Sequence, residues 1–249
     1  MTITGWHHIR KYTGGGLAAI ADFLLPRHCL MCGLPSGDSN LCPPCQADLP
    51  RPGNCCRRCG LPLPGVGDTL CGPCIKRPPP WNRVTAALDY CFPVDALVQR
   101  FKFNRNLACG VVLARELADA VMASPVTAPR PYAIVPVPLH RSRHVSRTFN
   151  QSELLARFVG KRMGVPVNSL LLSRVKRTPA QSGLDAKSRR KNTRGAFHCH
   201  YRHARGIRHA VLVDDVMTTG ATLDACTREL KRSGIQEISI WVVARAPPP

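Results

Sequence analysis

The chain has 249 residues, 44% of them hydrophobic, so it is long enough for two units of unequal size and apolar enough to bury an ordinary core. These values exclude disorder throughout the chain, and no apolar run reaches the ~18 residues that a membrane-spanning helix needs. Lysine and arginine number 35 against 15 acidic residues, a formal net charge of +20. Such a balance favours polyanionic partners, either nucleic acid or phosphorylated metabolites.

Residues 1–25 are predicted to form an amino-terminal extension that ends in a short amphipathic helix over 17–25. Asp22 interrupts the apolar run and no small-residue cleavage site follows, so a secretory signal peptide is disfavoured. Eight of the 13 cysteines lie in Cys-x-x-Cys pairs, a metal-ligand spacing that fits a reducing compartment better than an oxidising one. We therefore expect the protein to be cytoplasmic.

The four cysteine pairs lie in a proline- and glycine-rich segment over 26–76, which we predict to be a zinc-binding module. Two tight turns, each with two thiolates, supply the four sulfurs of a tetrahedral zinc site, so the module is expected to hold two structural zinc ions. The spacing does not decide which pairs share an ion. An iron–sulfur cluster or disulfides are the alternative uses of these thiols. The ligands are Cys29, Cys32, Cys42, Cys45, Cys56, Cys59, Cys71 and Cys74.

The proline run over 77–80 is predicted to be a linker to a second domain over 81–249, in which strand-like and helical segments alternate. Such alternation predicts an α/β fold, a parallel sheet with helices on both faces. The segments are approximately 84–91, 94–103, 107–122, 132–138, 150–163, 167–172, 209–214, 220–233 and 237–243. The polar, arginine-rich stretch over 173–208 is predicted to be either a long functional loop or a mobile excursion from the sheet.

The most informative stretch is an apolar strand over 209–213 that ends in two acids and a threonine- and glycine-rich loop opening a helix. Backbone N–H groups and hydroxyls at a helix N-terminus bind phosphate, and Gly220 lets the backbone approach a ligand closely. Two adjacent carboxylates can accept hydrogen bonds from ribose hydroxyls and help to hold a divalent cation. The candidate ligand-binding residues are Asp214, Asp215, Val216, Met217, Thr218, Thr219, Gly220, Ala221 and Thr222.

This stretch resembles the phosphoribosyl-pyrophosphate (PRPP) loop of type I phosphoribosyltransferases, in which an apolar strand, two acids and an apolar residue precede T-T-G-A-T. The resemblance implies that Asp214 and Asp215 hold the ribose hydroxyls and are the catalytic candidates, that 218–222 surround the 5-phosphate, and that Mg²⁺ accompanies the pyrophosphate. A second stretch, over 133–141, is a strand running into a turn where that family has its pyrophosphate loop. The turn residues are Val137, Pro138, Leu139, His140 and Arg141.

The four cysteine pairs, V-P-V-P-L-H at 135–140, R-T-F-N-Q at 147–151 and the PRPP loop together resemble the ComF (GntX-like) competence family. The resemblance implies an amino-terminal double zinc ribbon and a type I phosphoribosyltransferase-like domain. It also implies a role in the uptake of single-stranded DNA in natural competence, in the cytoplasm or at the inner face of the membrane without insertion, beside a competence helicase and a membrane DNA channel. The alternatives are an active Mg-dependent phosphoribosyltransferase on a base or nucleic-acid acceptor, or a PRPP-responsive regulator. Thr148 stands where the family usually has glycine.

Residues 139–209 carry 17 lysines and arginines against two acids, so this segment holds most of the net charge. Because attraction to phosphates dominates nonspecific nucleic-acid affinity, we expect it to contact nucleic acid, single-stranded DNA above all, or a polyphosphate. The alternative is that these residues form only a solvated charged face. For Asn150, in R-T-F-N-Q, the alternative to a functional role is that it only caps the following helix. The nucleic-acid candidates are Arg143, Arg147, Arg189, Arg190 and Lys191.

Overall fold

The computed structural model describes residues 28–36, 39–65, 69–124, 133–139, 149–176, 193 and 195–247. The chain divides into two compact units, 1–48 and 49–249. The first unit includes helix α2 (Pro43–Ala47) and four of the paired cysteines, and the second includes the whole sheet. Among the described residues, no helix is both long enough and apolar enough to cross a membrane.

The second unit is built on a four-stranded sheet in which every neighbouring pair of strands is parallel. Its order is β1 (Arg83–Asp89), β6 (Glu237–Arg245), β5 (His209–Met217) and β2 (Ala133–Pro136). The two central strands are buried over almost their whole length, as strands covered on both faces must be. Their near-continuous apolar sequence is therefore a consequence of helices lying on either side.

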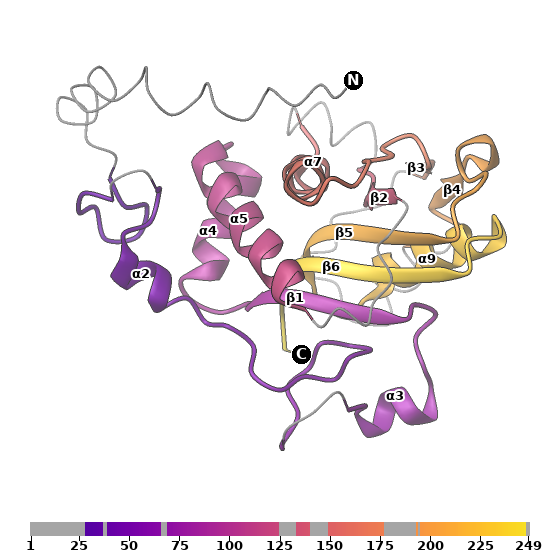
Figure 1. Cartoon of the computed structure of the whole chain (residues 1–249), viewed down its shortest axis with the longest axis horizontal. Helices are drawn as coiled ribbons and strands as arrows, with labels where there is room; N and C mark the ends of the chain where they lie inside the picture. The colour runs from indigo at the N-terminus through magenta and orange to yellow at the C-terminus, as the bar shows by residue number, and fades with distance from the viewer. Residues whose placement is uncertain are drawn as a thin grey trace, which may run out of the picture. The chain divides into compact units, whose positions relative to one another are not determined.

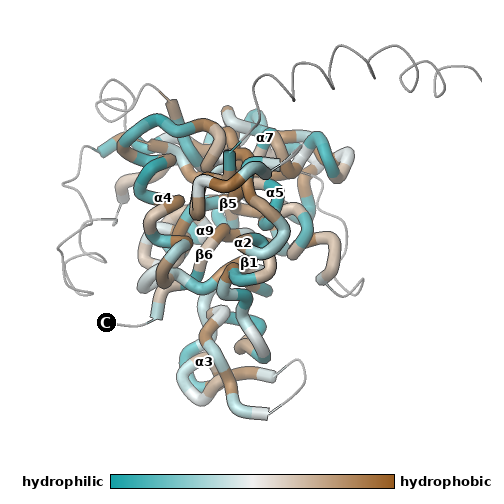
Figure 2. Tube along the Cα trace, turned by 90° about the vertical axis from the view of Figure 1, so that its left-hand side faces the viewer, coloured by the Kyte–Doolittle hydropathy of each residue, from teal (hydrophilic) through white to brown (hydrophobic). Residues whose placement is uncertain are grey.

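Three helices lie on one face of the sheet, where Figure 1 shows them side by side. Helix α5 (Leu107–Ala123) contacts β1 and β6, α7 (Gln151–Met163) contacts β2 and β5, and α4 (Val94–Phe103) packs against α5. Figure 2 shows hydrophobic residues gathered around the central strands. Side chains from this layer contact residues 214–222, the predicted PRPP loop, which is called the phosphate loop from here on.

The other face of the sheet packs against α9 (Ala221–Arg232). Alternate residues of β5, Ala210 and Leu212, belong to one buried cluster with Leu223 and Leu230 of this helix. The predicted α/β architecture, a parallel sheet with helices on both faces, is confirmed.

Both ends of the predicted 173–208 stretch have secondary structure outside the main sheet, so a loop is wrong there, whereas an excursion from the sheet agrees with the described residues. Strands β3 (Leu172–Arg174) and β4 (Phe197–Cys199) form a separate antiparallel pair, and a short 3₁₀ turn η1 (Tyr201–His203) follows. Each strand has three residues, too few for an alternating pattern to stand out, although buried Phe197 and Cys199 do flank exposed His198. Residues 177–192 and 194 lie outside the described part of the chain.

The second half of the predicted 26–76 module folds with the sheet in unit 49–249, whereas the first half lies in the other unit. Helix α3 (Gly72–Lys76) follows the third cysteine pair, and the loop of that pair is hydrogen-bonded to the start of the sheet. The N–H of Val84 donates to the carbonyl of Arg57 at 2.8 Å, and Trp81 Nε1 donates to the carbonyl of Arg58 at 2.6 Å. These bonds are the physical reason that the division of the chain falls inside the predicted module.

Candidate functional site

A cavity of about 490 Å³ lies at the carboxyl ends of β2 and β5. It is lined by 137–139, which follow β2, and by 214–223, which run from the end of β5 into α9. These strands are neighbours in the sheet, with Ile134 paired to Val211. Ligands of open α/β sheets bind outside the carboxyl ends of the strands, so this cavity is the expected place for one. His140 and Arg141 of the predicted pyrophosphate loop lie outside the described residues.

Asp214, the first acid of the loop, is held by hydrogen bonds from neutral groups. Ser152 Oγ donates to its Oδ1 at 2.9 Å, and the backbone N–H of Asp215 donates to the same oxygen at 3.0 Å. Burial, and then the neighbouring carboxylate of Asp215, raises the pKa of Asp214 to about 7, while Lys102 and the two hydrogen bonds act in the opposite direction. A small change in the surroundings of Asp214 therefore decides whether it is charged at neutral pH.

Asp215, the second acid, forms an ion pair with Lys102 of α4, the Nζ to Oδ1 distance being 2.8 Å. Both side chains are largely buried at the cavity wall. The end of α4 is fixed from α7, where Gln151 Nε2 donates to the carbonyl of Lys102 at 3.4 Å. Sequence reasoning missed Lys102 and Ser152, because each comes from an element far from the loop in sequence and neither has a local signature.

Asn150 caps α7, since its Oδ1 accepts from the N–H of Ser152 at 3.1 Å. Its Nδ2 also donates to the carbonyl of Val137 at 3.1 Å, and both partners are buried. Helix capping was the structural alternative predicted for Asn150. The structure adds a second contact, which fixes Val137, the first residue of the predicted pyrophosphate loop. Arg147 and Thr148 lie outside the described residues.

Gly220 ends the phosphate loop in a left-handed conformation, with φ at +74°, and is the N-cap of α9. A Cβ there would lie 3.1 Å from Met217 Cε and 3.1 Å from Cη2 of Trp81. Both the backbone conformation and the packing therefore require glycine. The turn is closed by Thr219 Oγ1, which accepts from the N–H of Ala221 at 3.4 Å.

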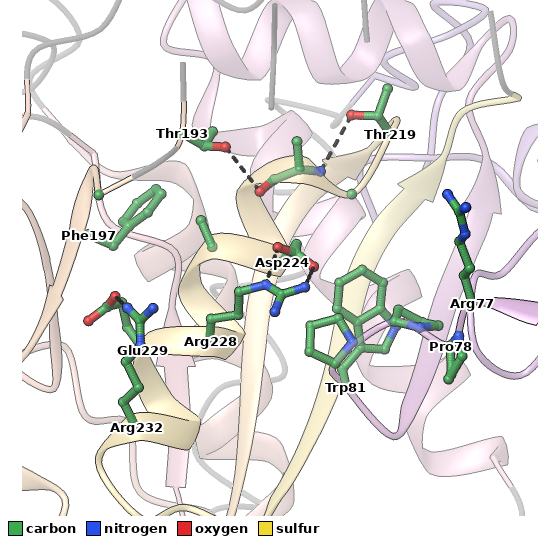
Figure 3. A pocket seen from close by; sticks show the side chains of 16 residues that line it. Arg77, Pro78, Trp81, Thr193, Phe197, Thr219, Asp224, Arg228, Glu229 and Arg232 are labelled. Carbon is green, nitrogen blue, oxygen red and sulfur yellow. Dashed lines mark hydrogen bonds and ion pairs between the residues drawn. The ribbon is translucent and has the colours of Figure 1, made fainter. Parts of the chain in front are cut away.

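A second cavity, of about 580 Å³, shares Thr219, Gly220 and Ala221 with the first. Figure 3 shows the residues that line it, including Trp81 and the preceding proline segment over 77–80, which was predicted only as a linker. Its α9 wall carries ion pairs at i, i+4 and i, i+3, Arg228 with Asp224 and Arg232 with Glu229. Because these arginines face acids of the same helix, their charges are largely balanced.

The eight paired cysteines form two separate groups, in each of which all sulfur atoms lie within 4.8 Å of one another. The sulfurs of Cys32 and Cys42 are 3.6 Å apart, as are those of Cys59 and Cys71. Sulfurs at about 2.3 Å from a common tetrahedral zinc would be about 3.8 Å apart, whereas a disulfide bond is close to 2 Å. Consecutive pairs thus share a site, which the spacing left open. The groups are Cys29, Cys32, Cys42 and Cys45, and Cys56, Cys59, Cys71 and Cys74.

The backbone of each group favours thiolate, the form that binds metal. Burial opposes ionisation of Cys29, but N–H groups including that of Cys32 outweigh it and lower the pKa of Cys29 to about 6. Burial likewise opposes ionisation of Cys56, yet N–H groups including that of Cys71, which lies 3.3 Å from the sulfur, lower its pKa to about 7. The first thiol of each group is thus the readiest to ionise, whereas the hydrogen bond with Cys42 raises the pKa of Cys45, and burial raises the pKa values of Cys59 and Cys74. Donor type and spacing therefore fit a zinc ion in each group.

A basic surface segment, 198–208, begins within β4 and contains no acidic residue. The rings of His198 and His200 lie edge to face with centroids 5.1 Å apart, and Tyr201 is 56% exposed. The exposed cationic or titratable residues are His198, His200, Arg202, His203, Arg205 and Arg208. Sequence reasoning counted this segment only in the overall charge. Its named candidates Arg143, Arg147, Arg189, Arg190 and Lys191 lie outside the described residues.

Comparison with known proteins gives two family matches that together cover most of the chain. The Double zinc ribbon domain matches residues 20–81, and the Phosphoribosyl transferase domain matches residues 109–248. Among solved structures, a purine phosphoribosyltransferase from Pyrococcus horikoshii Ot3 is 18% identical, with a TM-score of 0.30 over 63% of this chain and 74% of that chain.

Relatives of similar length share both parts. The DNA utilization protein YhgH of Salmonella typhi is 36% identical over 89% of this chain and 98% of its own, and competence protein F of Haemophilus influenzae is 35% identical over 88% and 96%. The resemblance that the motifs suggested therefore holds over nearly the full length of each protein. The chain belongs to the ComF family of competence and DNA utilization proteins, with a double zinc ribbon and a phosphoribosyltransferase domain.

Proposed function

We propose that this protein binds PRPP at the cavity between β2 and β5 and assists the uptake of single-stranded DNA in natural competence. One observation supports PRPP as the ligand. Residues 137–139 and 214–222, which were predicted separately to bind pyrophosphate and phosphoribosyl groups, line a single cavity. The acids can accept hydrogen bonds from the ribose hydroxyls, and the turn into α9 offers backbone N–H groups to the 5-phosphate. Lys102 and Arg174 supply cationic groups to the same wall.

The residues of the cavity also fit Mg²⁺, because they offer two adjacent carboxylates beside the place expected for the pyrophosphate. Mg²⁺ prefers oxygen ligands and is usually held by one or two carboxylates together with substrate phosphates. Asp214 and Asp215 would hold it, and when bound it would neutralise charge on the pyrophosphate. The ion pair of Asp215 with Lys102 leaves Asp214 as the carboxyl more available to the cation.

The DNA role is supported by the names of relatives, competence protein F and DNA utilization protein, and by the basic surface segment 198–208. Arginines there would contact phosphates without regard to base sequence, and Tyr201 offers an exposed ring on which a base of a single strand can stack. We place the protein in the cytoplasm or at the inner face of the membrane, beside a competence helicase and a membrane DNA channel.

A phosphoribosyltransferase activity is the second candidate, and the surroundings of Asp214 favour it. A general base works best when its pKa lies near the working pH, and burial raises the pKa of Asp214 to about 7. In such a reaction the nitrogen of an acceptor would attack the ribosyl carbon while pyrophosphate leaves, and Asp214, instead of holding the cation, would accept the proton lost by the nucleophile. A base or a nucleic acid would be the acceptor.

Calorimetric titration of the protein with PRPP and Mg²⁺ tests the site. Replacing both Asp214 and Asp215 with Ala should abolish binding while zinc content and melting temperature show that the fold is kept. Asn at both positions should be less damaging, because its amide keeps an acceptor but loses the charge, and charge-assisted hydrogen bonds are about twice as strong. Unchanged binding in the double Ala variant would refute the assignment. Release of pyrophosphate in the presence of single-stranded DNA or free bases would establish the second candidate.

A further inference from the structure

Arg245, at the end of β6, is buried between the second cysteine group and the phosphate loop. Its Nε donates to the carbonyl of Cys59 at 2.7 Å. Its Nη1 donates to the carbonyls of Met217 at 2.9 Å and Thr218 at 2.7 Å, the two residues at which β5 turns into the loop. A single guanidinium thus joins a residue of the cysteine site to the backbone of the proposed phosphate-binding turn.

Trp81 makes a second connection between the same two places. Its Nε1 donates to the carbonyl of Arg58, and the side chain of Arg58 donates to the carbonyl of Trp81. The ring of Trp81 lies against Gly220, where a Cβ would approach it to 3.1 Å, and Figure 3 shows it lining the cavity that adjoins the loop. Gly60, next to Cys59, has φ at +67° and packs against the Arg245 side chain, where a Cβ would lie 3.5 Å from Cδ.

We propose that Arg245 is a positioning residue that couples zinc occupancy of the second cysteine site to PRPP affinity of the phosphate loop. This inference rests on the proposed PRPP site and adds its regulation. Metal binding orders a cysteine turn, and the carbonyl of Cys59 then has a fixed place against the guanidinium. The guanidinium holds the carbonyls of Met217 and Thr218, so that the turn before α9 keeps the conformation that receives the 5-phosphate.

The two sites must influence each other equally, because a coupling free energy is reciprocal. Zinc in the second site should raise PRPP affinity, and Mg-PRPP should raise zinc affinity of that site by the same factor. The first cysteine site lies in the other compact unit and provides the matched comparison within one chain. Chelator competition reads zinc affinity directly and does not depend on any catalytic activity.

The first experiment compares Arg245→Lys with wild type. Lysine keeps the charge, but its single nitrogen cannot donate at once to Cys59 on one side and to Met217 and Thr218 on the other. We expect the variant to retain both zinc ions and its fold, to bind Mg-PRPP about tenfold more weakly, the equivalent of about 1.4 kcal/mol, and to lose the effect of PRPP on zinc affinity. Arg162→Lys, which alters an exposed ion pair with Asp119, is the control for the substitution itself.

The second experiment compares Cys59→Ser, in the second site, with Cys32→Ser, in the first. PRPP affinity should fall more in Cys59→Ser, and in wild type Mg-PRPP should strengthen zinc binding at one of the two sites. Two results would overturn the inference but leave the PRPP site standing, provided that the wild type binds PRPP. One is an equal loss of PRPP affinity in the two cysteine variants. The other is an undiminished effect of PRPP on zinc affinity in Arg245→Lys. Wild type that does not bind PRPP at all overturns the proposed site and the inference together.

Discussion

The Nζ of Lys102 lies 2.8 Å from Oδ1 of Asp215, so a cation from α4 faces the second acid of the phosphate loop. The first acid, Asp214, instead accepts from the hydroxyl of Ser152 and from a backbone N–H. Two carboxyl groups that are adjacent in sequence thus have different surroundings, one ionic and one neutral. Different surroundings assign different chemical roles to neighbouring carboxyls.

PRPP affinity should rise with pH up to neutrality, because the ribose hydroxyls donate to the ionised carboxylate. Burial, with the adjacent Asp215, raises the pKa of Asp214 to about 7, so below that pH the group must lose a proton when the ligand binds. Linkage then weakens binding by up to about tenfold for each pH unit below 7, and binding releases a proton. Calorimetry in buffers of different ionisation enthalpy measures that proton.

The control for this pH dependence is Asp214→Asn, which removes the titrating group but leaves the ligand's own ionisation in place. Its binding profile should be flatter than that of wild type. Relative to wild type, the same variant should also gain stability as the pH rises from about 4 to about 7 and keep that gain above 7. A carboxyl whose pKa is raised on folding costs stability progressively over that range, up to about 4 kcal/mol at 1.36 kcal/mol for each pKa unit. A profile as steep as that of wild type would assign the proton to another group.

Lys102→Met should move the midpoint of that pH profile upward by about one unit, because an opposite charge within reach lowers a carboxyl pKa by about 1–3 units and Lys102 acts on Asp214 in this direction. Lys161→Met, at an exposed position on α7, should leave the midpoint where it is. The measurement is PRPP affinity from pH 5.5 to 8.5. An unmoved midpoint in Lys102→Met would mean that the ion pair contributes nothing to the titration of the site.

The sequence predicted the phosphate loop because all of its chemistry is contiguous: a buried strand, two acids and a glycine that opens a helix. It could not predict Lys102 or Ser152, since only the packing of α4 and α7 on the sheet brings these side chains to the acids. Spacing alone could not pair the cysteines either, because any two Cys-x-x-Cys turns supply four thiolates. Arg245 ends an apolar strand and has no pattern of its own, and its importance comes from the backbone carbonyls that its guanidinium contacts, those of Cys59, Met217, Thr218 and Ala246.

Metal analysis should give about two zinc ions per chain in protein purified without a chelator. The structure sharpens this for double variants: Cys29→Ser with Cys42→Ser, in one site, should retain about one ion, and Cys29→Ser with Cys71→Ser, in two sites, should retain none. Cys71→Ser should also destabilise the sheet unit, to which the second site is hydrogen-bonded. An iron–sulfur absorption band, or disulfides without metal in reduced protein, would contradict the assignment.

Single-stranded DNA should bind the basic surface segment 198–208 with little sequence preference. Replacing Arg202, Arg205 and Arg208 with Ala should weaken binding equally for all sequences, and should flatten the plot of log affinity against log salt by about 0.7 for each phosphate that the protein no longer neutralises. Tyr201→Ala should cost a further ~1–3 kcal/mol if a base stacks on the exposed ring. Fluorescence anisotropy over a range of salt concentrations measures both effects.

The comparison variant for DNA binding replaces Arg189, Arg190 and Lys191 together, which tests the run that the sequence singled out. A matched control removes three arginines that form ion pairs on helix surfaces, Arg157, Arg162 and Arg228. If DNA contacts 198–208, replacing the three arginines of that segment should lower DNA affinity more than replacing the three control arginines. Equal losses in the two sets would reduce the effect to net charge, and a loss confined to 189–191 would move the DNA site there.

Gly220→Ala should weaken PRPP binding, and Gly206→Ala provides a control with the same backbone conformation. Their φ angles are +74° and +76°, so alanine at either position costs about 1–2 kcal/mol of stability in chemical denaturation. Only at Gly220 would the new Cβ meet neighbours, at 3.1 Å from Met217 and Trp81, whereas nothing lies within 4 Å at Gly206. Because the Trp81 ring is fixed by its bond to Arg58, the loop itself must shift, and PRPP affinity should fall in Gly220→Ala alone. Equal PRPP affinity in the two variants would show that the close packing of this turn does not serve the ligand.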